Sequence, residues 1–432
     1  MSPKTRSDQA IAPHGWVQAL LTVLSGLLAM GVTAALGLWA AGATDLPDGA
    51  FPRVVAATVV TAVGGTIELS GDAGGLAGTE AGLTVIPLSV TLVGALVIAA
   101  GFLRPLRHRA VARVGELAGW AARVAALWLL ALLALAFGAR QTFPLSVGDD
   151  TLSDLGDLFG VSPKVGFETD VPQTLCLGLL WLAGVLVLAL LVSRGAPLPA
   201  RLLRFQATVR PAAYAMVVLL LAYVVLGVVI GLVVALTRGH AVETLAVILL
   251  GLPNLAWLAL TLGLGATWKG RVEGPFGLPM PHVLDEVLRG SDTATLNLRT
   301  LAEYDGRVWW LVAVDAVLLL TAAFVMAARS PAGVRAWQHA LHLAVALALT
   351  VLMICLLGRI SAHYGLSVLG IGDLGGDLNG ELLLKPEVWT AVGLAALWGL
   401  VAGFLGALLA RPVRRGGATG PAGVDNARDQ DT

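Results

Sequence analysis

The sequence predicts an all-α, polytopic integral membrane helix bundle with eight spanning helices, two broken or re-entrant segments and two tandem duplicated halves. Two observations predict this class. Hydrophobic residues make up 57% of the 432 residues and charged residues only 13%, whereas a soluble domain carries about 25% charged residues. Eight apolar stretches are also about as long as a helix that crosses the hydrocarbon of a bilayer, which needs roughly 20 residues.

The expected spans are uninterrupted apolar runs, in chain order 17–41, 83–103, 117–139, 172–193, 211–236, 308–328, 338–358 and 388–410. Seven tryptophans fall at span ends, where aromatic residues gather at membrane interfaces: Trp16, Trp39, Trp268, Trp309, Trp310, Trp337 and Trp389. Two further stretches are ambiguous. Residues 54–67 form only about 21 Å of helix, which is short for a crossing. Residues 244–266 are long enough, but Pro253-Asn254 breaks them, because proline removes a backbone donor.

The charge distribution decides whether these two stretches cross. If they do not, the cytoplasmic side holds 16 cations and 5 acids, and the outer side holds 11 cations and 22 acids. If both crossed, the basic loops 104–116 and 194–210 would lie outside, against the tendency of Lys and Arg to stay in the cytoplasm. We therefore expect a plasma-membrane protein with cytoplasmic termini, in which both stretches are re-entrant or interfacial and are entered from outside.

The order of elements repeats along the chain. Each half reads as a span, a broken apolar stretch, two spans, an acidic Gly/Asp loop and a span. The predicted boundaries are a cytoplasmic N-terminus at 1–16, halves at 17–194 and 209–411, a cytoplasmic linker at 195–208 and a disordered cytoplasmic tail at 412–432. A shift of 217 residues places Trp181 on Trp398 and Asp170 on Glu387. Both halves have one orientation, as in the parallel repeats of transporters.

Several strings give the chain a family likeness: AVGGTIELSGD (62–72), IPLSVTLVGALVI (86–98), SRGAPLP (193–199), VRPAAYA (209–215), LLGLPNLAWL (249–258) and LAEYDGRVW (301–309). On these strings, residues 15–411 resemble the streptophobe family, multi-spanning membrane proteins of actinobacteria. The resemblance implies an actinobacterial plasma-membrane protein and implies no activity.

The broken stretches are the strongest pointer to a site. Gly64-Gly65, followed by Glu68, and Pro253-Asn254 lie in corresponding positions of the two halves, and transporters unwind such paired segments around their substrates. Asp315 is the one acid within a predicted span, roughly 10 Å deep by helical rise. A carboxylate there needs a partner, a proton or water, and Arg359 is the expected partner. The alternative is a structural role near the interface.

A second group of polar residues is expected on the cytoplasmic side. Arg123 lies inside a span, and His339 and His342 share one helical face at the matching depth. Without a carboxylate nearby they make a poor metal site, and an interfacial role is the alternative. The acidic loops 147–160 and 369–381 fit no EF-hand, and the G-x-G-x-x-G of 370–375 lies between membrane helices, outside the context that binds dinucleotides. We predict no metal, cofactor or catalytic residue.

Three functions stay open. The first is a non-enzymatic, envelope-associated protein that contacts a protein partner through the outer segment 267–307, which holds an amphipathic patch at 283–289. The second is a permease or channel-like transporter of a small solute or ion, with its path between the halves. The third, an enzyme acting on lipid-linked substrates, lacks paired intramembrane acids and known catalytic motifs. Zero net charge argues against a nucleic-acid partner.

Overall fold

The computed structural model describes residues 15–45, 49–72, 77–108, 114–144, 164–193, 200–272, 294–331, 333–368 and 380–411. Contacts divide the chain into two compact units. Unit 1 comprises Met1–Leu202, Leu245–Gly251 and Leu366–Leu374, and unit 2 comprises Leu203–Thr244, Leu252–Gly365 and Gly375–Thr432. The division falls within two helices and one strand of the second half.

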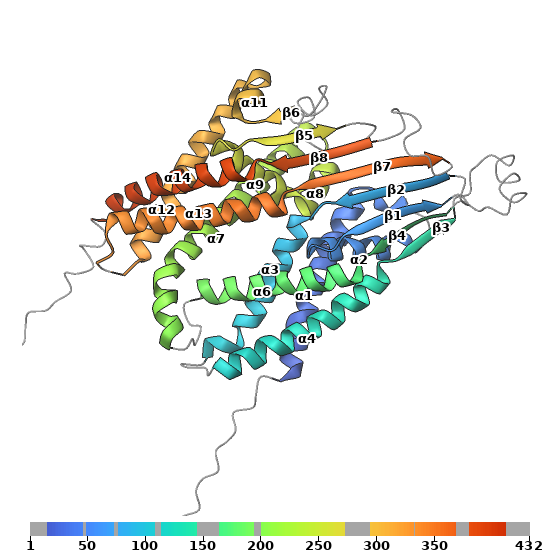
Figure 1. Cartoon of the computed structure of the whole chain (residues 1–432), viewed down its shortest axis with the longest axis horizontal. Coiled ribbons are helices and arrows are strands. Elements are labelled where there is room, and N and C mark those ends of the chain that lie inside the picture. The colour runs from blue at the N-terminus through green and yellow to red at the C-terminus, as the bar shows by residue number, and fades with distance from the viewer. Residues whose placement is uncertain are drawn as a thin grey trace, which may run out of the picture. The chain divides into compact units, whose positions relative to one another are not determined.

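Unit 1 combines helices with a four-stranded antiparallel sheet (Figure 1). Its helices are α1 (Trp16–Ala40), α2 (Ala50–Ala62), α3 (Leu88–Leu103), α4 (Val114–Gly138) and α6 (Val171–Val192), with short 3-10 turns η1 (Ala43–Asp45) and η2 (Pro105–His108). Its strands are β1 (Ile67–Asp72), β2 (Ala77–Thr84), β3 (Gln141–Pro144) and β4 (Lys164–Thr169), in the order β3-β4-β1-β2. The strands follow α2 and α4 and precede α3 and α6, so the sheet lies at one end of these helices.

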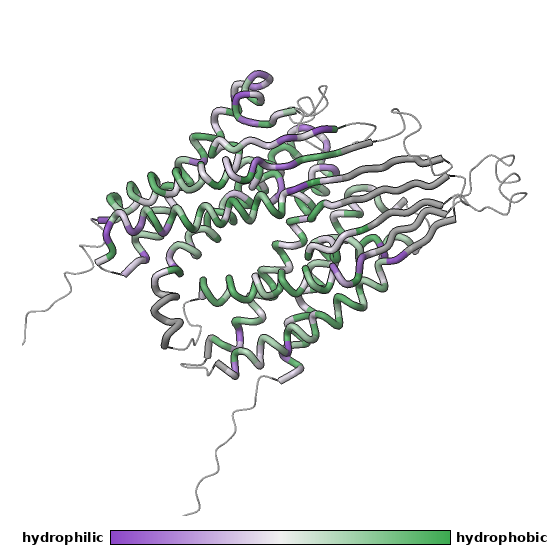
Figure 2. The backbone as a smooth tube through the Cα atoms, viewed as in Figure 1, coloured by the Kyte–Doolittle hydropathy of each residue, from purple (hydrophilic) through white to green (hydrophobic). Residues whose placement is uncertain are grey.

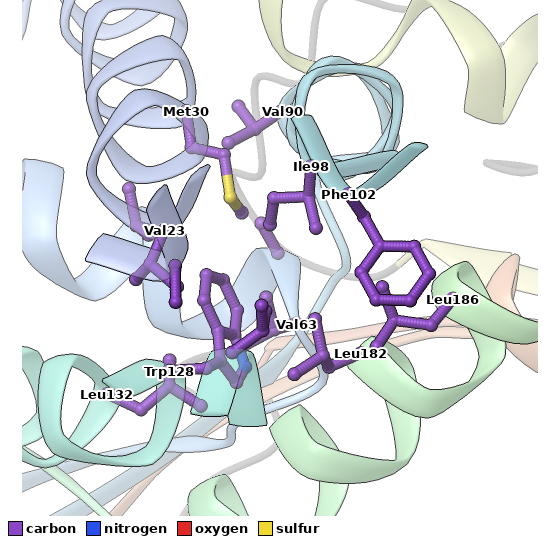
Figure 3. Close-up of a cluster of buried hydrophobic side chains, with 14 of the residues drawn as sticks. Val23, Met30, Val63, Val90, Ile98, Phe102, Trp128, Leu132, Leu182 and Leu186 are labelled. Atoms are coloured by element: carbon purple, nitrogen blue, oxygen red, sulfur yellow. The ribbon is translucent and has the colours of Figure 1, made fainter. Parts of the chain in front are cut away.

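The first and third helices of unit 1 pack antiparallel through small residues. Gly26 lies against Ile98, Gly94 against Met30 and Gly101 against Thr22, so residues later in α1 meet residues earlier in α3. Figure 3 shows the apolar core around this contact, with Val23 and Met30 facing Val90 and Ile98, and Trp128 beside Val63. Because α3 starts beside the end of α1, the chain between them leaves and returns at the same end of the helix pair.

Unit 2 repeats this combination. Its helices are α7 (Ala200–Arg238), α8 (Ala241–Leu250), α9 (Leu252–Gly263), α11 (Leu298–Tyr304), α12 (Trp310–Arg329), α13 (Ala336–Leu357) and α14 (Val388–Leu409), with η3 (Gly306–Trp309). Its strands are β5 (Trp268–Val272), β6 (Ala294–Leu296), β7 (Ile360–Val368) and β8 (Gly380–Pro386), in the order β7-β8-β5-β6. The division between the units falls within α7, α8 and β7, so that 200–202, 245–250 and 366–368 of these elements belong to unit 1.

The helices α7 and α12 of unit 2 are also antiparallel. Tyr223 of α7 contacts Asp315 of α12, and the guanidinium of Arg329 lies 4.0 Å from the ring centre of Tyr214. The later helices α13 and α14 pack through Gly399 and Gly403, which lie against Ala344 and Ala340. The chain between α7 and α12, which includes the bent pair α8 and α9, therefore also returns to the end from which it left.

The protein is a multi-pass membrane protein by helix length and composition. Within the described residues, seven helices are long and apolar enough to cross a membrane: α1, α4, α6, α7, α12, α13 and α14. Figure 2 shows hydrophobic residues along most of their length. Large apolar side chains also point outward, and Leu236 is 86% exposed. Such exposure suits hydrocarbon rather than water.

The structure corrects three details of the predicted architecture. The expected span 83–103 is a helix of 16 residues, because 83–84 belong to β2 and Pro87 caps the helix. The second broken stretch is bent by 75° at Gly251, whereas Pro253 sits in the first turn of α9, where proline is tolerated. The described residues are mostly helical, as predicted, but the fold is not all-α, since strands are present in both units.

Six of the seven tryptophans predicted at the membrane interfaces are exposed at helix ends: Trp16, Trp39, Trp309, Trp310, Trp337 and Trp389. Trp268 is different, because it begins β5 and is buried. The predicted acidic loops, the amphipathic patch at 283–289 and the tail from 412 lie largely or wholly outside the described residues.

Candidate functional site

The site in unit 2 is built around the end of α9. Gly265 has a φ of 93°, which favours glycine. The N–H of Gly265 bonds to Leu262 O at 2.8 Å, and the N–H of Ala266 bonds to Thr261 O at 2.9 Å. These two bonds form a Schellman motif, which ends the helix and satisfies its last carbonyls. The chain then turns directly into β5. The motif therefore fixes the position of Gly263, two residues before Gly265.

The carboxyl of Asp315 lies against this helix end. Asp315 is 3% exposed, and the hydroxyl of Tyr223 on α7 donates a hydrogen bond to its Oδ1. Its Oδ2 accepts no hydrogen bond from any residue that the structure describes. Gly263 faces the same carboxyl so closely that a Cβ at this position would overlap Oδ2. Three helices, α7, α9 and α12, therefore converge on one acidic group.

Three tryptophan side chains fix α9 in place beside the Asp315 carboxyl. Trp257 donates its indole N–H to Leu220 O of α7 at 3.2 Å, and Trp398 of α14 donates to Leu264 O at 3.1 Å. The indole of Trp268 donates to Thr261 Oγ1 at 3.0 Å. Since buried indole N–H groups need acceptors, these bonds fix α9 between α7, α14 and β5.

The chemistry of this arrangement favours a proton over a metal ion. The Tyr223–Asp315 contact brings the side-chain oxygens of two residues together, whereas a hard cation such as Ca²⁺ takes six to eight oxygen ligands. Among the described residues, no group of three or more His, Cys, Asp or Glu side chains is placed to hold a metal ion. An ionised carboxylate in hydrocarbon costs about 2.5–3.5 kcal/mol, so binding or releasing a proton changes the energy of this site strongly.

The structure brings together only part of the predicted path. Asp315 is central, but Arg359 follows α13 as an exposed residue and Tyr223 takes the expected place of its partner. The predicted Asp315–Arg359 pair was therefore wrong. Pro253 is buried and Asn254 half-buried in the first turn of α9, at the opposite end from Gly263.

The remaining members of the predicted path belong to unit 1. Gly64 and Gly65 end α2, and Glu68 lies in β1, where only its backbone is described. Each is described within unit 1 alone.

The predicted cytoplasmic cluster divides between the two units. Arg123 lies in α4 of unit 1, half-buried, whereas His339 and His342 lie in α13 of unit 2. His339 is buried in the region where α13 packs on Gly403 of α14, and His342 is half-buried. His339 is thus part of the interface between α13 and α14.

Sequence reasoning missed Tyr223. It lies in the middle of a long apolar run, and the chain contains only four tyrosines, but nothing in the sequence relates it to an acid 92 residues later. The signal that could have found it is chemical, since a buried carboxyl needs a donor and Tyr is a donor that a span tolerates.

No family model matches the chain, and neither a curated protein nor a solved structure matches it. The resemblance to the streptophobe family stays a prediction.

Proposed function

We propose that the protein is a permease-like membrane protein in which Asp315 binds and releases a proton. The observation that carries the proposal is the buried carboxyl of Asp315, which has one hydrogen bond from Tyr223 and a second oxygen without a partner among the described residues. Ionisable residues within spans are costly and mark proton relays and ion pathways in pumps and transporters. No enzymatic step is part of this proposal.

A comparison with unit 1 supports a role beyond packing. There α2 ends in the same Schellman motif, with Gly64 N–H bonded to Thr61 O and Gly65 N–H to Val60 O. Ala62, two residues before Gly64, corresponds to Gly263, and its carbonyl accepts a 2.6 Å hydrogen bond from Thr91 of α3. A neutral hydroxyl is therefore enough to join these elements in unit 1, so packing alone does not call for a carboxyl.

The same correspondence supports the proposed duplication. The strands of the two units have matching orders, with β1 to β4 replaced by β5 to β8 in turn. Gly64 lies against Leu177, and Gly265 lies against Leu394, a pair related by the shift of 217 residues that also relates Trp181 to Trp398. Only the second copy carries the acid.

The antiparallel pairs support the proposed topology. Because α1 and α3 pack antiparallel, as do α7 and α12, the elements between them are consistent with excursions that do not cross. We propose that 54–67 and 244–266 are re-entrant or interfacial, that both termini are cytoplasmic and that the sheets face the outside of a plasma membrane.

The second candidate is an envelope-associated protein without transport activity. The two sheets favour it, because each unit presents strands beyond its helix ends, and β3 and β6 are short edge strands of the kind that extra-membrane partners contact. The partner segment predicted at 267–307 is described only at 267–272 and 294–307.

Proton movement distinguishes the two candidates. Purified protein is reconstituted into liposomes that enclose a pH-sensitive dye, and a potassium diffusion potential drives protons inward. We expect acidification with the wild-type protein and with Glu303→Gln, an exposed control in unit 2, and background rates with Asp315→Asn. Asn keeps an acceptor for Tyr223, so the fold should survive. Equal fluxes for wild type and Asp315→Asn would refute the role of Asp315.

A further inference from the structure

We infer that unit 1 binds one acyl chain of an anionic phospholipid in an apolar groove between α4 and α6. The groove has a volume of about 410 Å³, and all of its lining residues are apolar. Ala118, Ala122 and Ala125 form one wall on α4, Leu179 and Ala183 lie on the facing wall of α6, and Phe102 of α3 completes it. The inference concerns unit 1 alone and is independent of Asp315.

The shape of the groove follows from the sequence of α4. Alanines at 118, 122 and 125 recur at spacings of four and three, so they share one helical face. The facing positions of α6 are mostly Leu and Val, with Ala183 among them. Small side chains opposite larger ones leave a channel along the helices, which runs from near the first turn of α4 to about its middle.

The position of the groove commits it to a lipid chain. Both walls belong to helices that are long and apolar enough to cross a membrane. Ala118, Ala122, Leu179 and Ala183 are exposed in the structure. In a bilayer the medium around these residues is hydrocarbon, so the groove faces the acyl chains of the surrounding lipids.

The charge near the groove selects the headgroup. The groove lies toward the start of α4 and the ends of α3 and α6, which is the end away from the sheet. Arg104 is exposed there, two residues after Phe102. The segment 104–116 carries four arginines and a single acid, Glu116. Arginines beside a membrane attract anionic lipid headgroups, so phosphatidylglycerol should bind in preference to phosphatidylcholine.

Native mass spectrometry of the full chain in detergent tests both the acyl-chain groove and the preference for an anionic headgroup. The protein is titrated with phosphatidylglycerol and, separately, with phosphatidylcholine of the same acyl chains. We expect wild type to retain one phosphatidylglycerol preferentially. Ala118→Leu/Ala122→Leu fills the groove and should lose that bound lipid whatever its headgroup. Arg104→Gln should lower the preference for phosphatidylglycerol about fivefold, the effect of one surface arginine, and leave phosphatidylcholine binding unchanged.

The control is Ala134→Leu, the same substitution at an exposed position of α4 outside the groove, which should bind lipid as wild type does. Unchanged lipid retention in Ala118→Leu/Ala122→Leu would overturn the site. An unchanged lipid preference in Arg104→Gln would overturn the assignment of the headgroup. If the wild-type protein were a dimer and Ala118→Leu/Ala122→Leu dissociated it, the occupant of the groove would be a second copy of the chain. That result would also overturn the lipid site.

Discussion

Gly263 has no Cβ, and this leaves the room that the Asp315 carboxyl occupies. In Gly263→Ala the new Cβ would overlap Asp315 Oδ2, so either the acid must leave Tyr223 or α9 must move. We expect a loss of about 1–3 kcal/mol in the free energy of unfolding, as for other overpacked cores. Thermal unfolding in detergent measures it. In an Asp315→Ala background the same substitution should cost much less, and an equal cost in both backgrounds would contradict the contact.

Trp128 performs a structural role in the core of unit 1. Its indole N–H donates to Gly178 O at 3.0 Å, and its ring stacks on Trp181 with 5.3 Å between ring centres. Phenylalanine keeps a ring but has no donor, so we expect Trp128→Phe to lose about 1–2 kcal/mol of unfolding free energy. The matched control is Trp39→Phe at an exposed position, which should unfold as wild type does. A similar loss in both variants would argue for a general effect of removing indoles.

At the scale of residues, the sequence identified the acid but not its environment. Asp315 was predictable because a charged residue inside a span is costly wherever it lies. Its partner was not predictable, because Arg359 and Tyr223 are equally plausible along the chain and only the antiparallel packing of α7 and α12 selects Tyr223. Gly263 was missed since glycines are frequent in this chain, and only a close contact identifies the one that matters.

At the scale of elements, α13 and α14 pack through glycine more closely than any side chain would allow. A Cβ at Gly399 would lie 2.5 Å from Ala344 Cα, and backbone atoms cannot move aside as a side chain can. We expect Gly399→Ala to separate the helices and to lower the unfolding free energy by about 1–3 kcal/mol. Gly393→Ala, on the same helix with open space around it, should instead stabilise the protein by about 0.4–1 kcal/mol. Thermal unfolding of both variants in detergent checks the opposite signs.

The strands are the elements that the sequence did not reveal. Long apolar runs predict helices reliably because the bilayer demands both length and hydrophobicity. The strands meet no such demand. β2 reads AGTEAGLT and β8 reads GELLLKP, with few of the β-branched and aromatic residues that predict strands. Part of the pairing joins segments distant in the chain, such as Ile67 with Thr169, and no local signal encodes that part.

At the scale of the whole molecule, the order of the membrane helices and broken stretches was predictable, but their lengths were not. The repeated order of spans, broken stretches and loops predicted two duplicated halves, and the duplication stays a prediction. The two units differ at their helix ends, since Thr91 bonds to Ala62 O in unit 1 and Tyr223 bonds to Asp315 in unit 2.

The topology makes a prediction that involves every element. Basic loops predict that the C-terminal ends of α3 and α14 are cytoplasmic. The antiparallel helix pairs then require the helix ends next to the strands to be outside. With Cys176 and Cys355 replaced by Ser, Arg140→Cys in unit 1 and Glu303→Cys in unit 2 should react with an impermeant maleimide on intact cells. Arg104→Cys and Arg411→Cys, their matched controls at exposed positions of the opposite helix ends, should react only after permeabilisation. If Arg140→Cys and Glu303→Cys labelled from opposite sides, the broken stretch 244–266 would cross the bilayer, and the proposed topology of unit 2 would be wrong.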